Sequence, residues 1–273
     1  MRMRSGVAAL VYAVLIVASL SAILPFAWMV LTSLKPASEV TALSPVPSHP
    51  QWSNYLEVSK AAPFFGRYYL NSLFVAAWVT FLTCVTSAMA AFAIARLSWP
   101  GRNAVFTMYL ATMMIPGVVT TIPNFAIMVR LQMLDSYSGL IVPAAFSAFG
   151  TFLLRQFMLG VPRALDEASK LDGAGAWRVF LDVILPLTRP GLITLAIFTF
   201  MGNYGSLFWP LVMVKSESMR TLPVGLLQFD TAYNKATHLM MAASVMSIVP
   251  PLLLFVVGQK YLVRGIQLGA IKG

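Results

Sequence analysis

Six stretches of this chain contain no Asp, Glu, Lys or Arg, and each is between 19 and 30 residues long. Because about 20 apolar residues cross roughly 30 Å of hydrocarbon, each stretch is long enough to span a membrane once. Only 10% of the residues are charged, whereas ordinary soluble domains have about 25%. The sequence therefore predicts an all-α, polytopic membrane protein with six transmembrane helices. The expected spans cover about residues 6–34, 68–95, 104–129, 136–158, 190–214 and 239–260.

The first stretch has some features of a cleaved signal peptide. Arg2 and Arg4 precede it, and Ser19 and Ser21 form a small-x-small pattern. The apolar run continues past this pattern to Leu34, which makes it roughly twice as long as a typical signal core. We therefore expect an uncleaved first span.

The distribution of basic residues predicts the orientation. Six crossings place both termini on one side, and 12 of the 19 Lys and Arg residues lie at the span ends on that side, against seven on the other. The positive-inside rule then places both termini in the cytoplasm. The net charge of +10 suits a multi-pass protein of the cytoplasmic membrane that faces anionic lipid, and we expect no nucleic-acid partner.

The same six stretches limit the way in which transport could be driven. Ion-coupled carriers commonly place ionisable residues inside the membrane, and these stretches hold no Asp, Glu, Lys or Arg. The sequence also lacks GxxxxGK[ST], the loop that cradles nucleotide phosphates. We therefore expect a transport subunit without an ATPase site, to which another subunit delivers the energy.

Other reactive residues do not form a recognisable site. Cys84 is the single cysteine, so no internal disulfide is possible, and His49 and His238 are too far apart in the sequence to suggest a metal site. A membrane enzyme acting on lipid or cell-wall sugar is a different class of function. It would need clustered carboxylates or His, and Asp135, Asp230 and His238 form no such pattern.

Residues 161–191 form a sizeable charged segment between strongly apolar runs. Asp166 and Glu167 suit the positive N-terminal end of a helix, and Gly173 and Gly175 interrupt the helical pattern. The segment therefore predicts two short helices joined by a turn, held in water outside the membrane.

The second of these helices is expected to be amphipathic over residues 176–185. Arg178 and Asp182 have the i,i+4 spacing of an ion pair on its polar side, and Pro186 is expected to end it. The apolar side would hold Val179, Phe180, Val183 and Ile184.

The letters EASKLDGAGAWRVFLDVILP, from Glu167 to Pro186, resemble the EAA loop of the membrane subunits of binding-protein-dependent ATP-driven importers. Ser169 stands in place of the second Ala of that pattern. The resemblance implies that residues 161–187 form a cytoplasmic loop that docks on an ATP-binding subunit. The residues it assigns to coupling are Glu167, Ala168, Ser169, Asp172, Gly173, Leu185 and Pro186. A solvated loop without a partner is the alternative.

Further segments extend this likeness along the chain, including FFGRYYLNSLFVA, ARLSWPGR and FLLRQFMLGVP. They look closest to the carbohydrate importers of the maltose and glycerol-phosphate kind. The resemblance implies the type I importer permease fold, with a second homologous permease subunit, an ATP-binding subunit dimer and an extracytoplasmic solute-binding protein as partners. ATP and Mg would be bound by the ATP-binding subunits, and no cofactor is expected in this chain.

The fifth expected span combines amide, aromatic and small residues, the mixture that sugar recognition requires. Gly and Ser also serve helix packing, and Trp209 could instead anchor at the membrane interface. Sugar permeases of this group usually have Trp-Asn where this chain has Tyr204-Gly205. The candidates for the substrate path are Asn124, Asn203, Tyr204, Phe208 and Trp209.

The polar loop from Lys215 to His238 is either a solvated connector or, as the resemblance implies, a segment that leans into the solute-binding protein. Candidate contacts are Phe229, Tyr233 and Asn234. The sequence thus predicts a permease subunit of an ATP-driven importer for a sugar or sugar derivative, coupled through the EAA loop. The alternative is a permease of the same architecture for a glycerophosphodiester or a polyamine.

Overall fold

The computed structural model describes residues 5–42, 44–231 and 234–270. The chain forms two compact units, which are described separately. Unit 1 comprises Met1–Gly66 and Gly225–Val249, and unit 2 comprises Arg67–Val224 and Pro250–Gly273. Helices α3, α13 and α14 continue from one unit into the other.

Unit 1 begins with a long helix that continues through Pro25. Near the end of the unit, β1 and β2 form a two-residue antiparallel ladder in which Asp230 pairs with Lys235. Apart from this ladder the described chain is helical, as predicted. The elements of unit 1 are α1 (Ser5–Ser33), the 3-10 helix η1 (Ala37–Glu39), α2 (Asn54–Ala61), the 3-10 helix η6 (Leu227–Phe229), β1 (Asp230–Thr231), β2 (Asn234–Lys235) and the first part of α14 (Thr237–Ala270).

Two buried polar residues tie the end of α1 to the start of α2. Lys35 is fully buried; its Nζ donates to the Ser44 carbonyl over 2.7 Å and lies 5.0 Å from the centre of the Trp28 ring. The Asn54 amide donates to the carbonyls of Ser33 and Lys35 over 2.8 and 3.0 Å. Buried polar groups are tolerated where they are hydrogen-bonded in this way.

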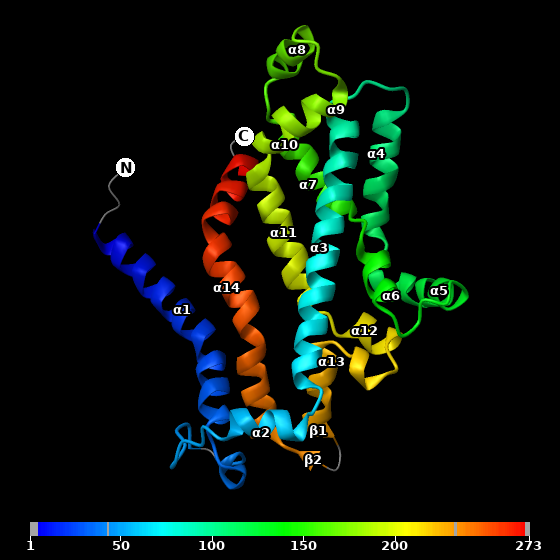
Figure 1. Ribbon diagram of the computed structural model, residues 1–273. Helices are drawn as coiled ribbons and strands as arrows, with labels where there is room; N and C mark the ends of the chain where they lie inside the picture. Colours follow the sequence, from blue (N-terminus) through cyan, green and yellow to red (C-terminus); the bar gives the residue numbers. More distant parts are fainter. Residues whose placement is uncertain (1–4, 43, 232–233, 271–273) are drawn as a thin grey trace. The chain divides into compact units, whose positions relative to one another are not determined.

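Unit 2 is built around α3, and Figure 1 shows α8 and α9 at one end of this helix and α12 near the other. Its elements are α3 (Phe65–Ala95), α4 (Arg102–Ala111), the 3-10 helix η2 (Thr112–Met114), α5 (Gly117–Arg130), α6 (Tyr137–Ile141), the 3-10 helix η3 (Val142–Ala144), α7 (Ala148–Leu159), α8 (Ala164–Leu171), α9 (Ala176–Arg178), the π-helix η4 (Val179–Ile184), α10 (Leu185–Leu187), α11 (Arg189–Tyr204), α12 (Phe208–Met213), the 3-10 helix η5 (Glu217–Met219), α13 (Leu222–Leu226) and the last part of α14.

Two apolar clusters hold unit 2 together, one at each end of α3. Near α8, Ala88, Ala91 and Ala95 of α3 present small side chains that let α7 and η4 approach closely. At the other end, Val75 and Val79 pack against residues of α5, α6 and α12. The two ends of the unit are therefore packed around one continuous helix.

Three helices are long and apolar enough to cross a membrane: Gly6–Ser33, Phe65–Ala95 and Thr237–Lys260. The number rises to six if each of three bent helix pairs counts as one span. The all-helical membrane architecture is thus confirmed, and the straight spans expected elsewhere are interrupted.

The third expected span, 104–129, is sharply broken. The segment Arg102–Met114 meets Gly117–Arg130 at 100°. The break lies at Ile115 and Pro116, where both residues have extended backbone angles, with ψ of 117° and 131°. Proline disfavours the α conformation of the residue before it, so the helix stops at this point.

The fourth and fifth expected spans are also divided. Tyr137–Ala144 meets Ala148–Leu159 at 44°, and Ser147 caps the second helix by accepting a hydrogen bond from the Gly150 amide. The span expected at 190–214 is helical only to Tyr204, and α12 begins at Phe208. The segment Ala176–Leu187 meets α11 at 75°.

Candidate functional site

The charged segment forms a hairpin at one end of unit 2, which we call the platform (residues 161–187). Its turn is a Schellman motif, the usual C-terminal stop of a helix. Gly173 has a φ of 79°, its amide donates to the Lys170 carbonyl over 3.0 Å, and the Ala174 amide donates to the Ser169 carbonyl over 2.9 Å. The turn that the sequence predicted at Gly173 is therefore present, and it uses a backbone conformation that favours glycine.

The return strand of the platform is a helix that passes through Pro186 to Leu187. The expectation that Pro186 ends it was wrong, because the break comes at Thr188, between α10 and α11. The preceding π-helix explains the difference. Its wider turns already move the carbonyls away from the α-helical positions with which a proline ring collides.

The apolar side of this helix is buried, as predicted. Val179, Phe180 and Ile184 are buried in the cluster with α3, and Val183 packs against it. The rings of Phe92 and Phe180 lie 4.9 Å apart. The polar side differs from expectation: Arg178 and Asp182, both described, form no ion pair, because a π-helical segment turns residues four apart away from a common face.

The other helix of the platform, α8, presents most of its residues to the surroundings. Glu167, Ala168 and Asp172 are exposed, and Ser169 is half-buried with its hydroxyl bonded to the Leu165 carbonyl over 2.8 Å. Leu171 is 90% exposed. A short helix with an acidic residue, a small residue and an exposed apolar residue is suited to contact with a partner protein. Of the remaining predicted coupling residues, Leu185 packs against the cluster with α3, and Pro186 is half-buried.

Asp166 and Arg96 form an ion pair that the sequence analysis did not predict. Arg96 directly follows α3, and its Nη1 donates to Asp166 Oδ2 over 3.1 Å. Its Nη2 donates to the Val161 carbonyl over 2.7 Å and also to the Met158 carbonyl. The side chains of Arg96 and Asp166 are only 3% and 12% exposed. The one signal in the sequence was an Arg at a span end, which charge counting assigns to the membrane surface.

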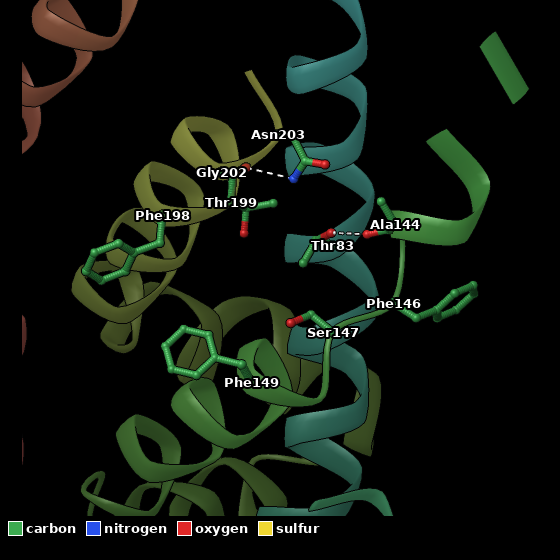
Figure 2. Close-up of a pocket in the computed structure, with 9 residues that line it drawn as sticks. All are labelled: Thr83, Ala144, Phe146, Ser147, Phe149, Phe198, Thr199, Gly202 and Asn203. Carbon is green, nitrogen blue, oxygen red and sulfur yellow. Dashed lines mark hydrogen bonds between the residues drawn. The ribbon is translucent and has the colours of Figure 1, made fainter. Parts of the chain in front are cut away.

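Two cavities open between the helices of unit 2. The first, of about 280 Å³, lies between α3, α11 and the segment that leads into α7, as Figure 2 shows. The Thr83 hydroxyl donates to the Ala144 carbonyl over 3.0 Å, and the Asn203 amide donates to the Thr199 carbonyl over 2.8 Å. This first cavity is lined by Thr83, Ala144, Phe146, Ser147, Phe149, Phe198, Thr199, Gly202 and Asn203.

The second cavity, of about 260 Å³, shares Ala144 and Asn203 with the first. Its Trp209 indole donates to the Gly139 carbonyl over 3.1 Å, which fixes the ring at the cavity wall. The lining residues are Val75, Gly117, Thr121, Asn124, Leu140, Pro143, Ala144, Asn203, Ser206, Trp209 and Pro210. Both cavities are lined by uncharged residues, with amides, hydroxyls and aromatic rings among them.

The second cavity brings together three of the five substrate-path candidates, Asn124, Asn203 and Trp209. Tyr204 is buried and stacks on Phe200, and Phe208 is 57% exposed, so neither lines a described cavity. Sequence reasoning missed the hydroxyl residues of the lining, because single Ser and Thr residues in apolar helices carry no distinctive pattern. These residues are Thr83, Thr121, Ser147, Thr199 and Ser206.

Asp135, weighed above as a residue of a membrane enzyme, has a structural role. It has a φ of 53°, and its Oδ1 accepts from the amides of Lys215 and Ser216 over 3.0 and 2.9 Å. Its Oδ2 accepts from the Ser216 hydroxyl. These bonds, with the charge of Lys215 as a smaller cause, lower the pKa of Asp135. Both carboxylate oxygens are thus engaged in holding the loop that follows α12.

Asn71 holds the same loop from α3. Its amide donates to the carbonyls of Ser218 and Arg220, each over 2.9 Å, and its Oδ1 accepts from the Tyr137 hydroxyl over 2.7 Å. The candidates for solute-binding-protein contact lie further along the chain. Phe229 is buried in unit 1, Tyr233 lies outside the described residues, and Asn234 belongs to β2, with its side chain outside the description.

Residues 64–268 match the family described as binding-protein-dependent transport system inner membrane component. The chain is 32% identical to the arabinooligosaccharides transport system permease protein AraQ of Halalkalibacterium halodurans over 256 residues, covering 92% of each chain. It is 34% identical to the sn-glycerol-3-phosphate transport system permease protein UgpE of Pectobacterium atrosepticum over 229 residues, covering 81% of each.

Solved structures show the same fold. A chain of a bacterial ABC transporter involved in the import of the acidic polysaccharide alginate superposes with a TM-score of 0.85 and 25% identity, covering 96% of this chain and 99% of that one. A chain of the MetNI methionine ABC transporter superposes with a TM-score of 0.56 and 18% identity, covering 74% of this chain and 96% of that one.

Proposed function

The chain belongs to the family of binding-protein-dependent transport system inner membrane components, and from this premise we propose how it works as a sugar permease. It is a permease subunit of an ATP-driven importer, with its helices in the cytoplasmic membrane. In our proposal, an ATP-binding partner pushes on the platform, and the movement opens and closes the path through unit 2. The chain has no ATPase site of its own, and ATP and Mg are held by the partner.

The observation that carries the coupling part of the proposal is the exposure of α8. Glu167 and Ala168 face the surroundings, while the neighbouring helix of the platform is packed firmly against α3. A helix that is exposed on one side and anchored through its neighbour can transmit a push as a rigid body. The platform lies on the cytoplasmic side in this proposal, together with both termini.

The cavities support a sugar as the solute. The second cavity combines the amides of Asn124 and Asn203 with the indole of Trp209, and no Asp, Glu, Lys or Arg lines either cavity. Amides and hydroxyls bond sugar hydroxyls, and an aromatic face packs against the C-H groups of the ring. Each cavity is slightly smaller than typical ligand pockets of about 300–1,000 Å³, so a second permease subunit would complete the binding site.

A second candidate is a phosphate-bearing solute, which the likeness to the glycerol-3-phosphate permease favours. The uncharged cavity linings argue against it, because a phosphate or a polyamine would lose hydration there without gaining an ionic partner. An extracytoplasmic solute-binding protein would deliver the substrate. The loop after α12 is the proposed contact region, although the side chain of Phe229 is buried and unavailable.

The test is transport by the complete importer in proteoliposomes, with radiolabelled arabinooligosaccharide and glycerol 3-phosphate as substrates. Glu167→Lys should lower uptake by about tenfold or more and leave membrane insertion intact, because it reverses charge at the docking helix only. The matched control is Asp182→Lys, since Asp182 is also an exposed acidic residue of the platform. Normal uptake by the Glu167→Lys importer would refute the role of α8.

A further inference from the structure

Arg96 lies where three segments of unit 2 meet. Its backbone continues the last turn of α3, with its amide donating to the Phe92 carbonyl over 2.9 Å. Its guanidinium reaches the Met158 and Val161 carbonyls at the end of α7 and the Asp166 carboxylate in α8. The last carbonyls of a helix carry partial negative charge, so one buried cation binds the end of α7 and the start of α8 together.

The anchoring of α8 depends on this contact to an unusual degree. Among the eight residues of α8, Asp166 is the buried one, and Leu165 and Leu171 are exposed. The helix therefore lacks the buried apolar stripe that normally fixes the position of a helix against its neighbours. The direction of α8 relative to α3 is set by the covalent turns at its ends and by the Arg96 to Asp166 ion pair.

The two helices that Arg96 joins to α8 also form walls of the cavities. Thr83 and Val75 of α3 line the first and second cavity respectively, and Phe149 of α7 lines the first. Any tilt of α8 that Arg96 transmits to α3 and α7 therefore reaches the cavity walls. Asp166 is next to Glu167, so the residue that receives the push and the residue that passes it on are consecutive in the sequence.

We propose that Arg96 and Asp166 are positioning residues that transmit movement of α8 to α3 and α7, and so to the cavities. This inference rests on the proposed function of the platform. An ion pair suits the task because its geometry is directional: the planar guanidinium reaches three oxygen atoms in fixed directions. An apolar contact would hold α8 equally well and allow it to slide.

The test compares uptake per ATP hydrolysed in proteoliposomes containing the complete importer. Asp166→Asn keeps the shape of the side chain and removes its charge, Arg96→Gln removes the cation, and the double variant combines them. Asp166→Asn should leave co-purification of the ATP-binding subunits unchanged and lower uptake per ATP by about tenfold, within the range of coupling between protein sites. In the Arg96→Gln background the same change should have less than about twofold effect, because its partner is already absent.

Asp182→Asn is the matched control, because it removes an exposed charge from the same platform. Uptake per ATP within about twofold of wild type for both Asp166→Asn and Arg96→Gln would overturn the inference. Loss of assembly with either change would also overturn it, since the pair would then be needed only for folding. Loss of coupling in Glu167→Lys with normal coupling in Asp166→Asn would leave the proposed function standing and remove this inference alone.

Discussion

Gly173 offers the sharpest test of the platform geometry. Its φ of 79° is a conformation that costs a residue with a Cβ roughly 1–2 kcal/mol. An added Cβ would meet nothing within 4 Å, so the cost of Gly173→Val is backbone strain and not collision. Since 1.4 kcal/mol is a factor of ten, the native turn should be populated about 5- to 30-fold less strongly relative to its alternatives.

The assay is the affinity of the purified ATP-binding subunit for the permease complex in nanodiscs. If docking requires the native turn, the dissociation constant rises by the same factor of about 5 to 30 when strained alternatives dominate. Gly175→Val is the control, because Gly175 has a φ of −70° and a ψ of 166° and equally open space around it. Gly173→Asn should weaken binding less than Gly173→Val, because Asn tolerates positive φ. Equal affinity for Gly173→Val and wild type would refute the reasoning.

Three further predictions concern stability, measured as the Tm of the detergent-solubilised complex. Gly191→Ala should lower the Tm, since its Cβ would lie 2.6 Å from the Phe157 ring and overpacking costs about 1–3 kcal/mol, whereas Gly202→Ala, with nothing within 4 Å, should not; equal Tm values would contradict the close packing. Asn54→Ala removes two buried hydrogen bonds and should destabilise unit 1 by about 1–3 kcal/mol, unless proteolysis near α2 is unchanged. The lowered pKa of Asp135 means that its contribution is complete above about pH 4 and is lost as the pH falls through the folded pKa, so below pH 4 the Tm of wild type should fall more steeply than that of Asp135→Asn; parallel pH profiles would contradict this.

The apolar pattern predicted the existence of the helices better than their continuity. Uncharged runs identify segments that can lie in lipid, and α1, α3 and α14 match the predicted first, second and sixth spans closely. The break at Pro116 was visible in principle, because proline restricts the residue before it. Pro25 and Pro123 are equally conspicuous and lie inside continuous helices, so the sequence alone does not say which proline breaks a span.

The coupling loop was easier to predict than the cavities. Its charged residues stand out between apolar runs, and Gly173 marks a turn by local chemistry alone. The contact between Arg96 and Asp166 joins residues 70 positions apart, and nothing in either local pattern indicates a partner. The cavities depend in the same way on which faces of α3, α7 and α11 meet, a property of packing that hydropathy does not encode.

The π-helix between Val179 and Ile184 has a consequence for insertions and deletions in this chain. An α-helix advances about 100° per residue, so the extra residue that a π turn accommodates changes the angular phase of everything that follows it. Removing one residue from this stretch would restore ordinary winding and preserve the helix, yet it would turn Leu185 to Leu187 by about a quarter of a revolution before α11 begins. The length of this short segment therefore acts as a phase setting between the cytoplasmic platform and the helix that carries Asn203.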